Sequence, residues 1–173
     1  ERQSCLPKTA SSDLWAGVSQ EPAAVPCMEE SVLSFLRSCE VLTSDWKQML
    51  EQAANAPEPE NLLAYTPALD QEIRLFTMDM LYRYYLRAAY AETPEAEILP
   101  VQMAAFAVCV VLLCSRRLGF HTAEQRLRIW QLFVKEIEYD GDNLEELEWQ
   151  LETNAAFSPA AFRAYFASLG GVQ

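Results

Sequence analysis

A run of 12 apolar residues, 103–114, constrains the fold of this chain more than any other feature. Every side chain in it is apolar, and the run is shorter than the roughly 20 residues that cross a bilayer as a helix. A helix that is apolar all round must be covered by protein on every side. We therefore expect residues 103–114 to form the buried central helix of a bundle.

Apolar residues recur at helical spacing through most of the rest of the chain, and no run of alternating β-branched residues predicts a strand. Besides the central helix at 101–117, the expected helices span about 29–39, 43–56, 66–90, 122–138, 142–151 and 158–169. The prediction is an all-α fold, a single bundle of about seven helices. Residues 1–27 are expected to be an extended or loosely docked segment, because they are rich in proline and small polar residues, and residues 28–173 form the helical domain.

Capping residues predict where several helices begin and end. Thr122 with Gln125, and Asp142 with Glu145, have the spacing of a capping box, so each pair is expected to begin a helix. Gly141 is expected to end the helix before the second pair, because glycine readily terminates helices.

Three further patterns give specific expectations. Pro94 and Pro100 are expected to lie in the turn before the central helix, because proline removes a backbone donor from a helix interior. Phe157 and Phe162 have the spacing of a hydrophobic staple at the start of the last helix. The helix over 122–138 has an expected apolar face of Leu127, Trp130, Val134 and Ile137, and an expected polar face of Glu124, Arg128, Gln131, Lys135 and Glu138.

Charge excludes two classes of partner. The chain has 13 Lys and Arg against 25 Asp and Glu, a net charge of −12. Such a surface repels phosphate backbones and anionic lipids, so we expect no nucleic-acid and no membrane partner. With five glycines and one histidine, the chain also lacks the material for a glycine-rich phosphate loop or a histidine metal site. We expect no metal and no cofactor in this chain.

The five cysteines are sparse and include no C-x-x-C pair, which is typical of a reducing compartment, and no leader segment is visible at Glu1. We therefore expect a cytoplasmic protein. Cys109 and Cys114 point roughly 140° apart on a helix, so they are expected to be buried apolar thiols. His121 precedes a helix cap and is expected to be a solvent-facing loop residue.

Trp149 is the most unusual aromatic residue in the pattern. On a helix it falls on the acidic face with Glu145 and Glu152, away from the leucines that mark the buried face. Either the Phe-rich segment that follows covers it, or it contacts another molecule; the sequence leaves both alternatives open. In the second case, Glu138 and Tyr139 are expected to extend the binding surface.

A second candidate binding surface lies at 81–90, where Tyr82 and Tyr85 belong to a tyrosine cluster that also contains two arginines. Tyrosine faces bind cations, including methylated lysine. The alternative is that the cluster belongs to the core, with the arginines serving as partners of buried tyrosine hydroxyls.

Three stretches also carry a family resemblance. They are VLSFL at 32–36 running into CEVLTSDW at 39–46, ENLLAY at 60–65 with LYRYYLRA at 81–88, and KEIEY at 135–139 followed by DNLEEL at 142–147. Together they resemble the C-terminal helical half of the flagellin lysine N-methylase family of bacteria, over about residues 30–160. The chain departs from that family in two ways. It lacks the clustered cysteines of the N-terminal half, and Tyr139 stands where the family is expected to have histidine.

The resemblance implies that the full protein transfers a methyl group from S-adenosylmethionine to the lysine ε-amine of flagellin. A cysteine-bound metal cluster would belong to the missing half. This chain would shape the substrate cleft or support the cysteine-rich half, and would be inactive alone. Its implied partners are a lysine-bearing, flagellin-like protein and that half. The alternative is a free-standing, non-catalytic all-α protein-interaction module.

Overall fold

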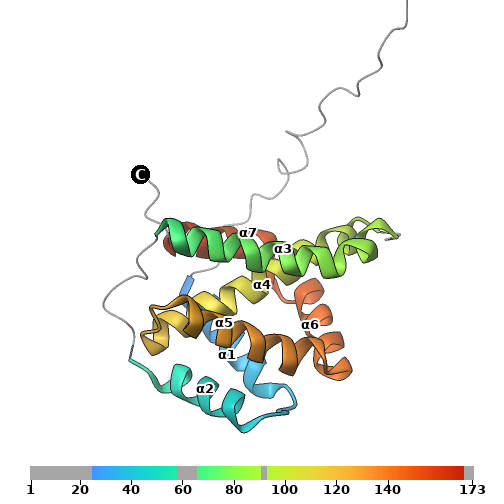
Figure 1. Ribbon diagram of the computed structural model, residues 1–173. Coiled ribbons are helices and arrows are strands. Elements are labelled where there is room, and N and C mark those ends of the chain that lie inside the picture. The colour runs from blue at the N-terminus through green and yellow to red at the C-terminus, as the bar shows by residue number, and fades with distance from the viewer. Residues whose placement is uncertain (1–24, 58–65, 91–92, 170–173) are drawn as a thin grey trace, which may run out of the picture.

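The computed structural model describes residues 25–57, 66–90 and 93–169, and the only regular secondary structure in these ranges is helix (Figure 1). The α-helices are α1 (Val25–Ser38), α2 (Ser44–Asn55), α3 (Pro67–Ala89), α4 (Pro94–Leu118), α5 (Ala123–Phe133), α6 (Gly141–Thr153) and α7 (Pro159–Leu169). A π-helical turn, η1 (Val134–Glu138), continues α5, and a 3-10 turn, η2 (Ala155–Phe157), precedes α7. The all-α prediction is confirmed. Residues 25–27, expected in the extended segment, belong to α1, and the rest of that segment lies outside the described ranges.

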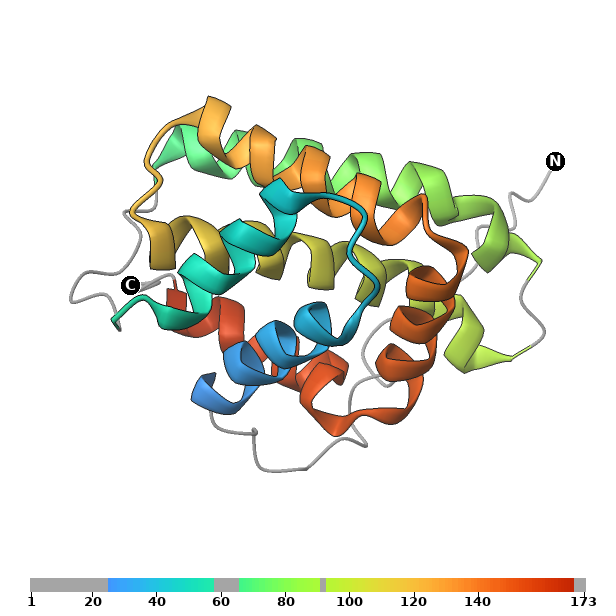
Figure 2. The same ribbon diagram turned by 90° about the horizontal axis from the view of Figure 1, so that it is seen from below.

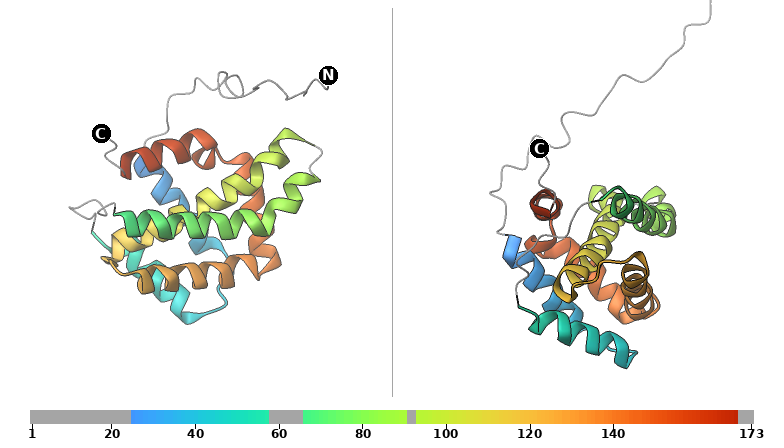
Figure 3. Two further views of the ribbon diagram at one scale, coloured as in Figure 1. Left: turned by 45° about the horizontal axis from the view of Figure 1, so that its top comes forward. Right: turned by 60° about the vertical axis from the view of Figure 1, so that its left-hand side comes forward.

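Helix α4 lies at the centre and contacts α2, α3, α5, α6 and α7. Figure 3 shows it passing between α3 on one side and α1 on the other. All residues of the predicted run 103–114 are buried except Ala105, which confirms the central apolar helix. By length and composition Glu97–Leu118 could cross a membrane, yet 78% of its most apolar window is buried against the other helices. That burial is the pattern of a core helix.

The expected position of Pro100 is wrong. Helix α4 begins at Pro94, and Pro100 lies inside it and is buried. A proline inside a helix costs about 3 kcal/mol, because one backbone hydrogen bond is lost and the ring crowds the preceding turn. The helix continues through this position because burial of the apolar residues that follow stabilises it by more than the proline costs.

Helix α3 lies along α4 and α5, and Figure 2 shows α3 and α5 side by side. Phe76 of α3 stacks on Trp130 of α5 with 4.6 Å between the ring centroids. Arg126 of α5 is buried and donates to both carboxylate oxygens of Glu72, at 2.6 and 3.0 Å. A bidentate guanidinium–carboxylate pair fixes orientation as well as distance, so it sets how α3 lies on α5.

The last helix is fixed by aromatic contacts. Phe157 and Phe162 are stacked with centroids 6.5 Å apart, so the predicted staple is confirmed. The Phe157 ring also meets Phe35 and Phe106 edge-on. Ser158 Oγ accepts from the Ala161 backbone N–H at 3.3 Å and caps α7. Together these contacts hold α7 against α1 and α4.

One predicted capping box is confirmed and the other is wrong. Thr122 and Gln125 form a complete box at the start of α5. Helix α6 instead begins at Gly141, because Asp140 is the cap: its Oδ1 accepts from the Asn143 backbone N–H at 2.8 Å. Gly141 therefore opens α6 rather than ending the previous helix.

The expected faces of the 122–138 helix are partly wrong. Leu127 is 46% exposed, and Glu138 has a nearly buried side chain. The buried positions are Arg126, Ile129, Trp130, Leu132, Phe133, Val134, Glu136 and Ile137. For Glu138 the cause is η1, where the Tyr139 N–H donates to the Val134 carbonyl five residues back at 3.2 Å. This wider turn rotates the residues after it, so Glu138 faces α3.

Replacing Phe106 by Ala tests the centre of the core. Phe106 is fully buried on α4 and contacts Phe35, Phe133 and Phe157, so Phe106→Ala leaves a cavity and should lower the free energy of unfolding by about 3–5 kcal/mol. Urea denaturation followed by circular dichroism measures this change. The control Leu127→Ala should change it by about 1 kcal/mol or less. Equal effects of both variants would contradict the core assignment.

Candidate functional site

An acidic surface with an exposed tryptophan lies on α6. Asp142, Glu145, Glu146 and Trp149 line an open hollow of about 430 Å³, and we call these four residues the α6 acidic surface. Trp149 is 55% exposed. The hollow is shaped by one large aromatic ring with three carboxylates beside it, which is the composition expected for binding a cationic side chain.

The sequence of α6 explains why these residues face outward. Leu147 and Leu151 are buried against the core, and Asn143 is buried beside them. Residues 142, 145, 146 and 149 lie on a different side of the helix from those anchors. Acidic residues near the helix start are also favoured by the positive end of the helix dipole.

Residues 155–169 do not bury Trp149. Phe157, the residue best placed in sequence to cover it, is fully buried and packs on Phe35, Phe106 and Phe162 instead. Among the described residues, the Phe-rich segment therefore belongs to the core and leaves the indole accessible. Glu145 and Glu152 are also exposed on α6, but Glu152 does not line the hollow.

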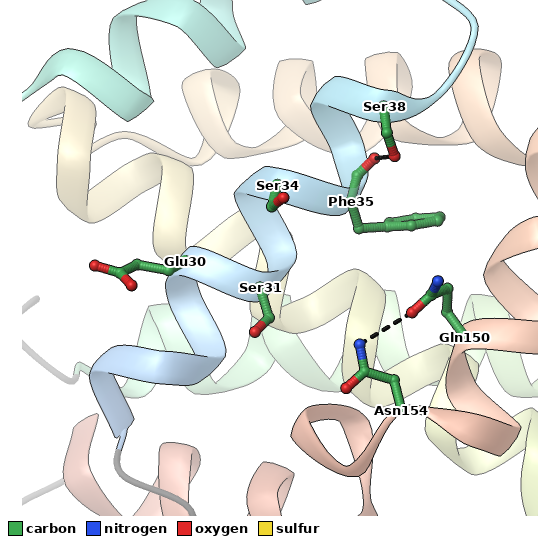
Figure 4. Close-up of a pocket in the computed structure, with 7 residues that line it drawn as sticks. All are labelled: Glu30, Ser31, Ser34, Phe35, Ser38, Gln150 and Asn154. Carbon is green, nitrogen blue, oxygen red and sulfur yellow. Dashed lines mark hydrogen bonds between the residues drawn. The ribbon is translucent and has the colours of Figure 1, made fainter.

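A polar cleft that the sequence patterns did not predict adjoins this surface. It measures about 500 Å³ and lies between α1 and the end of α6 (Figure 4). Its lining consists of Glu30, Ser31, Ser34, Phe35, Ser38, Gln150 and Asn154. The signal in the sequence was the serine spacing on α1, which places three hydroxyls on one side of the helix.

The cleft and the α6 acidic surface share an edge. Gln150 Nε2 donates to Glu146 Oε1 at 3.1 Å, and Asn154 Nδ2 donates to Gln150 Oε1 at 3.0 Å. Figure 4 shows Gln150 and Asn154 facing α1 across the cleft. Side-chain amides and hydroxyls can bind the backbone of a peptide whose charged side chain reaches the hollow.

The tyrosine cluster on α3 does not form a cage among the described side chains. Tyr82 is exposed, whereas Tyr84 is buried on the other side of the helix. Tyr85 lies in α3, but its side chain is outside the described part of the structure. Tyr84 belongs to the core, as the alternative interpretation expected, and Tyr82 belongs to the surface.

Glu138 and Tyr139 lie away from the hollow around Trp149. Glu138 Oε2 accepts from Arg83 Nη1 of α3 at 2.8 Å, and its side chain is nearly buried. Burial raises the pKa of the Glu138 carboxyl, while the Arg83 charge opposes that rise. Tyr139 is exposed next to this ion pair. The ion pair therefore joins Glu138 to α3, and neither Glu138 nor Tyr139 lines the hollow on α6.

A buried polar junction connects the loop after α1 to η1 and α6. Asn143 accepts from the Glu40 backbone N–H and donates to the Glu40 and Glu136 carbonyls, all at 2.8 Å. The fully buried Glu136 accepts from the Leu42 N–H at 2.7 Å and from the Thr43 hydroxyl. We call these contacts the loop junction. Each carboxylate oxygen of Glu136 and each amide atom of Asn143 is bonded to the backbone or to the Thr43 hydroxyl, so the junction holds the loop after α1 against η1 and α6.

A second buried charge cluster lies between α1 and α4. Glu29 is buried and accepts from Arg116 and from Arg117 Nη2, the latter at 3.1 Å. Both guanidinium groups are mostly buried. Buried charges must be paired, so this cluster ties the start of α1 to the end of α4 and explains why two arginines follow the apolar run.

The described cysteines and the histidine match their sequence-based expectations. Cys109 and Cys114 are fully buried, and burial raises the pKa of the Cys114 thiol to about 12 and that of Cys109 further. Burial likewise raises the pKa of Cys39 to about 12. Such thiols stay protonated and are poor nucleophiles. His121 is exposed in the loop before α5.

Within residues 25–57, 66–90 and 93–169, no group of three His, Cys, Asp or Glu side chains is arranged to hold a metal ion. No family model, curated protein or solved structure matches the chain. Three features of the described residues bear on its function: the α6 acidic surface, the polar cleft and the loop junction.

Replacing Trp149 tests whether its ring is free for a partner. Trp149→Ala should change the free energy of unfolding by about 1 kcal/mol or less, because over half of the residue is exposed. The matched control is Trp46→Ala in α2, where the tryptophan is fully buried and its loss should cost about 3–5 kcal/mol. Urea denaturation compares them. A loss at Trp149 as large as that at Trp46 would make Trp149 a core residue.

Removing the Asn143 amide tests the loop junction. Asn143→Ala removes a buried amide that makes three hydrogen bonds to backbone, and it should lower the free energy of unfolding by about 2–3 kcal/mol. Asn55→Ala is the control, because the exposed Asn55 amide makes one local bond to the Glu51 carbonyl. Its effect should stay below about 0.5 kcal/mol. Similar melting curves for the two variants would show that the junction contributes nothing.

Proposed function

We propose that this chain is the C-terminal helical region of a flagellin lysine N-methylase-like protein, where it receives the lysine-bearing substrate and supports a cysteine-rich N-terminal half. The observation that carries the proposal is that stretches of the family resemblance, far apart in sequence, bond to one another in space. Glu40 and Asn143, for example, are 103 positions apart and share two hydrogen bonds.

Each of these bonds joins two of the resembling stretches. Glu136 and Asn143, from 135–147, hold the backbone of 39–46 through the loop junction. Arg83, from 81–88, pairs with Glu138 of the same 135–147 stretch. A chance resemblance would not be expected to fall on residues that contact one another. A family pattern would, because members of a family share the contacts of one fold. This supports the proposal at the level of the fold.

The α6 acidic surface supports the substrate role. A lysine side chain combines a cationic ammonium with an apolar stem, and both halves find a match here. The carboxylates of Asp142, Glu145 and Glu146 attract the ammonium, while the Trp149 ring packs on the stem and adds a cation–π contact. The net charge of −12 speeds the approach of a basic segment from a distance.

In the whole protein, the methyl group would pass from S-adenosylmethionine to the lysine ε-amine. We assign that cofactor and the cysteine-bound metal cluster to the N-terminal half. The described thiols suit neither, because Cys39, Cys109 and Cys114 are buried with raised pKa values. The protein would be cytoplasmic, and this chain alone would bind flagellin without methylating it.

The alternative function is a free-standing all-α module that binds proteins and has no enzyme attached. The α6 acidic surface and the polar cleft would serve such a module equally well. The two functions differ in what the gene encodes, because only the methylase proposal requires a cysteine-rich segment upstream of Glu1. Reading the parent gene in that direction separates them.

Binding of purified flagellin tests the substrate role. Titration calorimetry should show binding of flagellin to this chain, and Trp149→Ala should weaken it about tenfold or more, as expected for a central aromatic anchor. Glu145→Gln with Glu146→Gln should also weaken binding, and more so at low salt. Acetylated flagellin should not bind, because acetylation removes the lysine charge.

Glu124→Gln is the control, because Glu124 is exposed on α5 and does not line the hollow. Its affinity for flagellin should equal that of the unaltered chain. Equal binding of native and acetylated flagellin, or full affinity in Trp149→Ala, would overturn the lysine-binding role. Transfer of labelled methyl groups to flagellin by this chain alone would overturn the assignment of the chemistry to the other half.

A further inference from the structure

An apolar stripe runs along the outer side of α3 and onto the residue that follows it. Its members are Leu75, Met78, Tyr82, Leu86 and Tyr90, and each is between 62% and 85% exposed. The spacing of three, four, four and four residues keeps all five on one side of a helix. We call them the α3 stripe. Figure 3 shows α3 on the outside of the bundle, with α4 behind it.

The stripe lies at the upper end of the range of apolar patch areas that monomers expose. Two tyrosines, two leucines and a methionine at these exposures present on the order of 600 Å² of mostly apolar surface. The largest exposed patch on a typical monomer is about 300–600 Å² and is often functional. A stable interface buries about 800 Å² per partner, of which about 65% is apolar in homodimers. The stripe alone supplies that apolar share.

The charges around the α3 stripe indicate which kind of partner can cover it. The chain carries −12 overall, yet α3 holds three acidic residues, Asp70, Glu72 and Asp79, and three basic residues, Arg74, Arg83 and Arg87. Most of these charges lie in ion pairs: Arg74 pairs with Asp70 at 2.7 Å, and Arg83 pairs with both Asp79 and Glu138 at 2.8 Å. Glu72 pairs with Arg126 of α5 at 2.6 Å. A second copy of so acidic a chain is repelled at most of its surface. Around the α3 stripe that repulsion is weaker, because the charges of α3 itself sum to zero and five of the six lie in ion pairs, so the surface does not select a basic partner.

The two halves of the stripe differ in shape. The earlier half has the aliphatic side chains Leu75 and Met78, and the later half has Tyr82, Leu86 and Tyr90. When two copies of α3 lie antiparallel, the aromatic half of each packs on the aliphatic half of the other. A two-fold axis near Met78 and Tyr82 makes the surface complementary to itself, as an isologous dimer requires. Antiparallel helix dipoles also attract one another.

We propose that a second copy of this chain covers the α3 stripe, forming a two-fold dimer with the two α3 helices packed antiparallel. This inference does not depend on the methylase proposal, because it uses neither α6 nor the loop junction. It leaves the α6 acidic surface of each copy available to a lysine-bearing partner.

Sedimentation equilibrium of the chain at micromolar concentrations tests the dimer. The expected mass is twice the 19.6 kDa of one chain. Leu86→Lys places a charge in the stripe and should return the mass to that of a monomer, with an unchanged circular dichroism spectrum. The matched control is Leu127→Lys, at an exposed leucine of α5 outside the stripe, which should remain dimeric.

Cross-linking tests the antiparallel arrangement. In a chain with Cys5 and Cys27 replaced by Ser, Leu75→Cys and Leu86→Cys are made separately, mixed, and treated with a short bismaleimide. An antiparallel dimer joins Leu75→Cys to Leu86→Cys in the mixture, and neither variant cross-links efficiently alone. A monomeric mass for the unaltered chain, a dimer that persists in Leu86→Lys, or cross-links formed by each variant alone would overturn the proposal.

Discussion

Burial of α4 is the constraint on which the rest of the structure depends. A helix with apolar side chains on every side leaves no face for water, so the other helices must surround it. Helices α2, α3, α5, α6 and α7 all contact it, and α1 is held to its end by the ion pairs of Glu29. This constraint determines that each outer helix has one face committed to the core and one face free for other uses.

Hydrophobic burial does not fix how the helices are oriented relative to one another. The buried polar groups fix that orientation. Apolar contact is non-directional, whereas the Arg126–Glu72 pair and the Asn143 amide accept only a narrow geometry. These groups lie where α3 meets α5 and where the loop after α1 meets α6. The α6 acidic surface depends on this second group, because Asn143 sets the position of the helix that displays Trp149.

The parts of the fold that could be predicted from sequence are those determined by local periodicity. The apolar run at 103–114, the Thr122 cap and the Phe157–Phe162 contact each follow from residues close together in the chain. Pro100 was misplaced because its local cost is overruled by burial of the surrounding helix. Glu138 was misplaced because a π-turn changes the periodicity on which a helical wheel depends.

The candidate site was predictable only in part for the same reason. Trp149 and Glu145 share a helix, so their shared face could be inferred, whereas the polar cleft joins α1 to the end of α6 and needs the tertiary arrangement. The exposed stripe on α3 was visible as an aromatic segment. Which tyrosines face outward could not be decided before the positions of α4 and α5 were known.

The π-turn η1 behaves as a one-residue insertion in an otherwise α-helical segment. Each residue of an α-helix advances the chain by about 100° around the axis, so one extra residue shifts the phase of everything that follows. Deleting a single position in η1 would restore α-helical phase and swing Glu138 away from Arg83. The length of this segment is therefore as much a determinant of the architecture as its composition, and evolutionary change by insertion or deletion is far more costly here than in the loops.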